Sequence, residues 1–172
     1  GKQCTVAWHV DDLMISHADY TMVSDLIGKL KGTFGKEAPL SVTCRKVHNY
    51  LGMEIDFRIP SKVQIRMIDY IQSMLEELPK DMNGTVAMLA AGHLFDVNDD
   101  ETKLDKETSK LFHHNVAKLL FLCKWAWPDT QTGVAFLTTW VKLPNTNDYK
   151  KLVWVMKYLW GMVDMPLNLP VI

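Results

Sequence analysis

The spacing of apolar residues changes partway along this 172-residue chain, and that change constrains the fold more than any other feature. In the first part, segments such as Cys4–Val10 and Lys62–Met67 are rich in β-branched and aromatic residues or alternate polar with apolar ones, which is typical of strands. After residue 68, apolar residues recur every three or four positions, which is typical of helices. Antiparallel strands followed by helices predict an α+β fold.

The strand-forming part contains two predicted hairpins with one helix between them. Asp11 and Asp12 interrupt a strand pattern that resumes at Leu13, so both carboxylates are expected at the tip of the first hairpin. In the second hairpin we expect one long strand in which Gly52 is a bulge or a close backbone approach. The expected elements are strands at Cys4–Val10, Leu13–Ser16, Val47–Phe57 and Lys62–Met67, a helix from Asp19 to Phe34, and a loop over residues 36–46.

The helical part is expected to hold four helices and one long connection. A short helix is predicted at Asp69–Leu78 and a long one at Asp105–Trp125. Residues 79–104 contain proline, glycine and an acidic run, so we expect a mostly irregular connection there. A third helix is predicted from Pro128 to Leu143, and a fourth runs from a cap at Asn147 to Trp160.

The composition is that of an ordinary globular protein, with 48% apolar and 23% charged residues. It excludes a disordered tail and a low-complexity linker. No apolar run approaches the roughly 18 to 20 residues that a membrane helix needs, so no membrane partner is expected. The three cysteines (Cys4, Cys44 and Cys123) are odd in number and widely spaced, which indicates neither a disulfide framework nor a metal knuckle. We therefore expect an intracellular location, cytoplasmic or nuclear.

The net charge of -1 hides an uneven distribution along the chain. Residues 22–66 carry eight basic and four acidic groups, and residues 108–172 carry seven and three, so each segment has a net charge of +4. Between them, residues 67–107 carry three basic and ten acidic groups, a net charge of -7. A phosphate backbone could lie along the basic segments. Ordinary solvated charge is the alternative explanation of the same pattern.

Asp11-Asp12 is the strongest chemical feature. Adjacent carboxylates attract cations, and Mg²⁺ is commonly held by one or two carboxylates together with substrate phosphates. Two such ions roughly 4 Å apart can hold the attacking and leaving oxygens of a phosphoryl transfer. The alternative is a plain surface turn, because aspartate is a favoured turn residue.

Several short motifs, each weak alone, occur in one order along residues 4–166. Trp8-His-Val-Asp-Asp-Leu13 resembles the YVDD-type motif C of reverse transcriptases. Tyr50-Leu-Gly-Met-Glu-Ile55 is similar to the primer-grip segment of copia-type retrotransposon polymerases. Further matches are Leu26–Phe34 to their motif D region, His113–Leu122 and Trp125–Thr130 to the helix and segment around A-R-P-D-I, and Leu152–Gly161 to the run L-x-x-x-x-x-Y-L-x-G. The chain as a whole resembles a copia-type reverse transcriptase.

The resemblance implies an organisation and a reaction. Residues 1–67 would form part of a palm, residues 68–127 a thumb with a long loop, and residues 128–172 a helical connection toward a ribonuclease H domain. The reaction would be RNA- or DNA-templated addition of deoxynucleotides with two Mg²⁺ ions. By position, Asp11 would be the first metal-binding carboxylate of motif C, and Asp12 the second, less direct one.

The resemblance also assigns roles around a primer-template of RNA and DNA. His9 stands where the family has an aromatic residue against the primer terminus. The primer grip would comprise Tyr50, Leu51, Gly52 and Met53. Lys36 would be the motif D lysine, although an ordinary solvated loop lysine is the favoured explanation. Arg45 and Lys46 would contact the template-primer backbone or belong to an ordinary polar loop.

Two departures from the family affect the functional prediction. Motif A and the fingers precede motif C in the family, and no counterpart stands before residue 1, so we expect a fragment without polymerase activity of its own. A tryptophan also replaces the arginine of A-R-P-D within the segment Trp125–Thr130. Three alternatives stay open: a non-catalytic nucleic-acid-binding module, a remnant that self-associates through an exposed palm surface, and an unrelated α+β domain with an accidental Asp-Asp turn.

Overall fold

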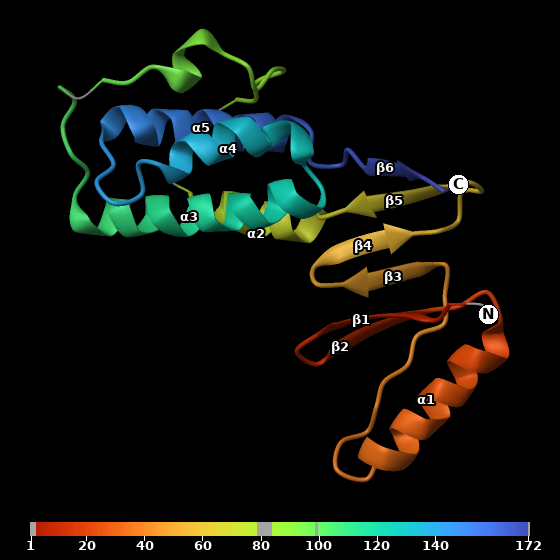
Figure 1. The fold of residues 1–172 in the computed structure, drawn as a ribbon. Coiled ribbons are helices and arrows are strands. Elements are labelled where there is room, and N and C mark those ends of the chain that lie inside the picture. Colours follow the sequence, from red (N-terminus) through yellow and green to blue (C-terminus); the bar gives the residue numbers. More distant parts are fainter. Residues whose placement is uncertain (1–2, 79–83, 99, 172) are drawn as a thin grey trace.

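A computed structural model describes residues 3–78, 84–98 and 100–171 of the protein. It combines antiparallel strands with helices, which confirms the predicted α+β class (Figure 1). In chain order the elements are β1 (Thr5–His9), β2 (Asp12–Ser16), α1 (Tyr20–Phe34), β3 (Val47–Tyr50), β4 (Met53–Asp56), β5 (Lys62–Arg66), α2 (Ile68–Glu76), the 3-10 turn η1 (Gly92–Phe95), α3 (Lys106–Trp125), the 3-10 turn η2 (Pro128–Thr130), α4 (Gln131–Thr138), α5 (Thr146–Gly161) and β6 (Leu167–Pro170).

The strands form two separate antiparallel sheets. β1 and β2 make a two-stranded ribbon in which His9 lies opposite Asp12. The second sheet has the order β3-β4-β5-β6. Its last strand was not expected: Leu167 and Leu169 pair with Ile65 and Val63 of β5, so the sheet gains a strand from the far end of the chain.

The prediction of one long strand over Val47–Phe57 is wrong. The chain reverses at Leu51 and Gly52, and Tyr50 lies opposite Met53 in the resulting β3–β4 hairpin. Both turn residues have positive φ, 53° for Leu51 and 75° for Gly52, as a type I′ hairpin turn requires. Gly52 is therefore a turn residue and not a bulge, because glycine adopts this conformation without steric cost.

The helices follow the prediction in number and order but differ at their ends. α4 ends at Thr138, earlier than the predicted Leu143. α5 is capped by Asn145 and not by Asn147, because the Asn145 side chain accepts from the backbone N–H of Asp148 while Asp148 accepts from the N–H of Asn145. Residues 79–83 and 99 of the predicted 79–104 connection lie outside the described residues. No helix in the described ranges is long and apolar enough to cross a membrane.

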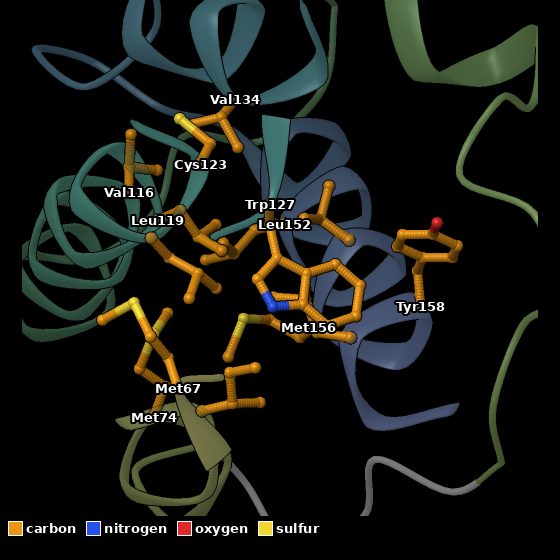
Figure 2. Close-up of a cluster of buried hydrophobic side chains, with 14 of the residues drawn as sticks. Met67, Met74, Val116, Leu119, Cys123, Trp127, Val134, Leu152, Met156 and Tyr158 are labelled. Carbon is orange, nitrogen blue, oxygen red and sulfur yellow. The ribbon is translucent and has the colours of Figure 1, made fainter. Parts of the chain in front are cut away.

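The hydrophobic core lies where β4, β5 and α2 meet the helices α3, α4 and α5 (Figure 1). Figure 2 shows Trp127 near its centre, next to Leu152 and Met156 of α5 and with the ring of Tyr158 to one side. The Trp127 and Tyr158 rings meet edge to face, with 6.1 Å between their centroids. Fully buried members include Ile71 and Met74 of α2, Phe112 and Leu119 of α3, Val134 and Leu137 of α4, and Leu152, Val155 and Met156 of α5.

Two oppositely charged side chains, Lys151 and Asp148 of α5, are buried inside this helical region. Lys151 of α5 is only 1% exposed, and its Nζ lies 3.5 Å from Oδ1 of Asp148 and 4.9 Å from the centroid of the Phe136 ring. Its Nζ also donates to the backbone carbonyl of Asp96. The Asn145 side chain donates to the backbone carbonyl of Asn98, which is a second hydrogen bond between the start of α5 and this connection. The start of α5 therefore holds the acidic connection against the core.

The first hairpin and α1 stand apart from this core. Residues 3–46, here called the N-terminal region, contain no buried side chain. Asp19 caps α1 by accepting from the N–H of Thr21, which accounts for the local start of this helix. Met14 of β2 is half-buried and packs against the core cluster. The N-terminal region is therefore folded locally but contributes little to the interior.

Candidate functional site

The first candidate site is the β1–β2 turn. Val10 and Asp11 form the turn itself, and Asp12 is the first residue of β2, opposite His9. All four side chains are exposed. Val10 has a φ of 49°, which is unusual for a β-branched residue and costs conformational energy. The Trp8 indole Nε1 donates to the Val10 carbonyl at 2.6 Å and so helps to hold this turn.

The carboxylate pair is not accompanied by further metal ligands in the described part of the chain. There, no group of three or more histidine, cysteine, aspartate or glutamate side chains is arranged to hold a metal ion. Mg²⁺ prefers six oxygen ligands, of which the protein usually supplies one or two carboxylates and the substrate supplies phosphates. Asp11 and Asp12 could contribute to one such ion, but the described residues do not fit a two-ion site by themselves.

The second candidate site is the β3–β4 turn, which carries the predicted primer-grip residues. Tyr50 and Leu51 are half-buried and pack against the core cluster, and Gly52 is exposed. Met53 is 3% exposed, so its side chain belongs to the core and offers no contact surface. Of the four predicted residues, Tyr50, Leu51 and Gly52 are therefore placed where they could meet a ligand.

The β3–β4 turn lies against helix α2. A Cβ atom added to Gly52 would stand 3.9 Å from Cδ2 of Tyr70, an ordinary contact distance. In Figure 1 the β1–β2 turn and the β3–β4 turn point in the same direction, although the two hairpins belong to separate sheets. The two turns therefore lie on the same side of the molecule in this view, but they are not parts of one sheet.

A further surface continues from this turn along α3 and was not predicted as a site. It consists of Tyr70, Phe121, Lys124 and Trp125, and we call it the aromatic–basic face. The ring centroids are 5.5 Å apart for Tyr70 and Phe121 and 6.3 Å apart for Phe121 and Trp125. Lys124 Nζ lies 5.3 Å from the centroid of the Trp125 ring. Aromatic rings beside a lysine are the groups that bind bases and phosphates of single-stranded nucleic acid.

Part of this surface was detectable in the sequence. Phe121 and Trp125 are four residues apart, a spacing that places side chains on one face of a helix. Tyr70 joins them only through the packing of α2 on α3, where its hydroxyl donates to the carbonyl of Lys118 at 3.3 Å. Burial, and to a smaller extent the charge of Glu77, raises the pKa of the Tyr70 hydroxyl, so this group stays protonated at neutral pH.

The remaining predicted contact residues lie in the connection between α1 and β3. Lys36 follows the end of α1, and Arg45 and Lys46 precede β3; all three side chains are exposed. Lys46 also accepts, through its backbone carbonyl, from the N–H of Phe57 at 2.8 Å. The structure does not test the predicted roles of these three cations, which stay predictions.

An ion cluster closes the far end of the β3–β4 hairpin. The Asp56 carboxylate is buried and accepts from Nε and Nη2 of Arg58, with 2.6 Å between Nη2 and Oδ2. Hydrogen bonds from the Arg58 side chain and backbone lower the pKa of Asp56 to about 2, and the charge of Arg66 acts in the same direction. Because both oxygens are engaged, Asp56 has a structural part and is not a candidate metal ligand.

Comparisons with known proteins add no relative. No family model, no curated protein and no solved structure matches this chain.

Proposed function

We propose that this chain is part of an RNA-directed DNA polymerase of the copia type and binds a primer-template of RNA and DNA inside the cell. The observation that carries the proposal is that each of the two motifs lies at a hairpin turn. The motif C-like segment has Asp11 in its turn, and the primer-grip-like segment has Leu51 and Gly52 in its turn. In the parent reaction, deoxynucleotides and Mg²⁺ would meet at the first turn.

The contact surface proposed for nucleic acid starts at the β3–β4 turn and follows the aromatic–basic face. Gly52 leaves the turn backbone accessible, because this residue is exposed and has no side chain. Phe121 and Trp125 offer ring faces for stacking, and Lys124 offers a cation for a phosphate. This surface needs no metal ion, so it can bind nucleic acid even where the carboxylate pair cannot support catalysis.

The test is a fluorescence-anisotropy titration with a labelled RNA–DNA primer-template at several salt concentrations. We expect affinity to fall as salt rises, because bound cations release counterions from the phosphates. Lys124→Glu should weaken binding and reduce the salt slope by about one. Lys142→Glu makes the same charge change at an exposed position after α4 and should have a smaller effect. The absence of binding at low salt would refute the proposal.

Catalysis is tested separately on the same samples. We expect no deoxynucleotide incorporation by this chain alone, since no third metal-binding side chain joins Asp11 and Asp12 among its described residues. Binding should also be insensitive to Mg²⁺ and to Asp11→Ala. Incorporation by the wild-type chain that is lost in Asp11→Ala would contradict this expectation and assign the turn a catalytic part.

A further inference from the structure

The outer edge of β1 is unpaired in the part of the chain that the structure describes. β1 has β2 as its only partner, and the ribbon joins no other sheet. All five β1 side chains are exposed, whereas Met14 and Ile15 of β2 are half-buried. A two-stranded ribbon is marginally stable in water by itself. β1 is therefore the strand with room for a further neighbour.

The hairpin register fixes which backbone groups point outward. His9 and Asp12 flank a two-residue turn, so they form a hydrogen-bonded pair, and the pairs alternate from there. Thr5, Ala7 and His9 consequently direct their N–H and C=O groups toward β2. Val6 and Trp8 direct theirs away from it, toward the open edge.

β1 also lacks the devices that usually protect an edge. Its sequence, Thr-Val-Ala-Trp-His, contains no lysine, arginine, carboxylate or proline. Val6 and Trp8 share one face of the ribbon with Leu13 and Ile15 of β2, because side chains alternate along each strand. Trp8 is 76% exposed and Val6 is 48% exposed. The open edge thus joins an exposed apolar face.

We propose that β1 pairs with β1 of a second copy of this chain, antiparallel, about a two-fold axis at Ala7. In this register Val6 lies opposite Trp8 of the second copy, and Trp8 lies opposite its Val6. Each such pair exchanges two backbone hydrogen bonds, using the groups that point outward. The ribbon becomes a four-stranded sheet, and the apolar faces of the two copies become continuous.

The residue types suit this register. A two-fold contact must be complementary to itself, and Thr5–His9 brings no like charges together because none of its side chains is a carboxylate, lysine or arginine. Ala7 meets its own copy at a pair without hydrogen bonds, where Cα atoms come to about 4.5 Å, and its small side chain fits there without a clash. Exposed Trp8 and Val6 gain a cross-strand neighbour, the kind of pair that stabilises sheets.

Disulfide trapping tests the register. In a chain with Cys4→Ser and Cys44→Ser, which leaves only buried Cys123, Ala7→Cys should give a covalent dimer on mild oxidation. Thr5→Cys is the matched control, because the two Thr5 positions would be roughly 14 Å apart, beyond disulfide reach. Equal dimer formation by both variants, or none by Ala7→Cys, would overturn the proposed register.

Sedimentation velocity over a range of concentrations tests the interface without oxidation. The wild-type chain should sediment faster as concentration rises, and Trp8→Lys should remain monomeric because it places a charge at the edge. Trp160→Lys, at an exposed position on α5, should behave like the wild type. A monomeric wild type, or a Trp8→Lys variant that still associates, would overturn the proposal. The inference does not rest on nucleic-acid binding, since either assay can succeed when primer-template binding fails.

Discussion

The N-terminal region and the rest of the chain use similar local patterns but reach different levels of burial. α1 has a side-chain cap and apolar residues at helical spacing, yet none of its residues is buried. α3 has the same kind of cap at Asp105, and six of its residues are buried. The two helices differ in their neighbours, because α3 packs against α4 and α5 whereas α1 has no comparable partner among the described elements. Local signals start a helix, and tertiary partners supply most of its stability.

Hydrogen exchange offers the largest expected contrast between the regions. Amides of α3 and α5 should open only with free energies near the global stability, about 5–15 kcal/mol for a typical domain. Amides of β1, β2 and α1 should exchange through local opening at a small fraction of that free energy. The measurement is native-state exchange followed by mass spectrometry. Equal protection in α1 and α3 would break the comparison.

A pair of phenylalanine truncations gives the next largest effect. Phe112→Ala, in the interior of α3, should lower the free energy of unfolding by about 3–5 kcal/mol, because it removes a fully buried ring and leaves a cavity. Phe34→Ala, at the end of α1, removes a ring that is 56% exposed and should change stability by about 0.5 kcal/mol or less. Urea denaturation of both variants measures the difference. Similar losses of unfolding free energy in the two variants would show that Phe34 is packed against other residues.

Two adjacent lysines of α5 test the buried ion pair. Lys151→Met should cost about 3–5 kcal/mol, because it leaves the Asp148 carboxylate buried without its cation. Lys150→Met removes a side chain that is 68% exposed, paired with Glu101 at 3.7 Å, and should cost about 0–1 kcal/mol. Urea denaturation again provides the measurement. The double variant Asp148→Asn with Lys151→Met should recover part of the loss, and a further drop would contradict this account.

Replacing two glycines by alanine is expected to change the stability of the chain in opposite directions. Gly52→Ala should destabilise the chain by about 1–2 kcal/mol, because alanine is strained at positive φ. Gly28 lies inside α1 with open space where a Cβ would stand, so Gly28→Ala should stabilise that helix by about 0.5–1 kcal/mol. Thermal unfolding followed by circular dichroism measures both. A stabilising Gly52→Ala would exclude the type I′ turn.

The last contrast is confined to acid. The pKa of Asp56 is lowered from 3.8 to about 2, so its contribution to stability is complete above the unfolded-state pKa and is lost as pH falls through about 2. Asp56→Asn should flatten the acid limb of the stability profile, measured as the urea midpoint against pH. Asp69→Asn, an exposed position on α2, serves as the control. If the acid limb is unchanged in Asp56→Asn, another group is responsible for the loss of stability at low pH.

Much of the architecture was predictable because its signals are local. The hairpin around Asp11 and the helices at Asp105–Trp125 and up to Gly161 follow from nearby residues: strand-forming runs, caps and apolar spacing. The α5 cap was misplaced by two residues, since two asparagines compete and only Asn145 has an aspartate three positions later. That rule is also local, so the capping box at Asn145 and Asp148 can be recognised from the sequence alone.

Other features depend on distant residues. The pairing of β6 with β5 joins segments about 100 residues apart, and no local pattern distinguishes Leu167–Pro170 from an apolar tail. The turn at Leu51-Gly52 lacks the usual asparagine or aspartate, so the segment read as one strand. The burial of Lys151 was equally invisible, because lysine on a helix is normally solvated. For the candidate site, the sequence located the first turn to within one residue but predicted a continuous strand at the second. Tyr70 lies beside Phe121 only through the packing of helices.

The placement of the tryptophans has an optical consequence. Trp8 is the only tryptophan before residue 125, and its indole is largely in water, whereas Trp127 is 2% exposed in the core. Indoles in water emit at longer wavelength and are reached by soluble quenchers, while enclosed indoles emit at shorter wavelength and are shielded. The tryptophan emission of the chain therefore contains two distinguishable components. The red, quenchable part of its emission includes the signal of the first ribbon, and the blue, shielded part follows the interior.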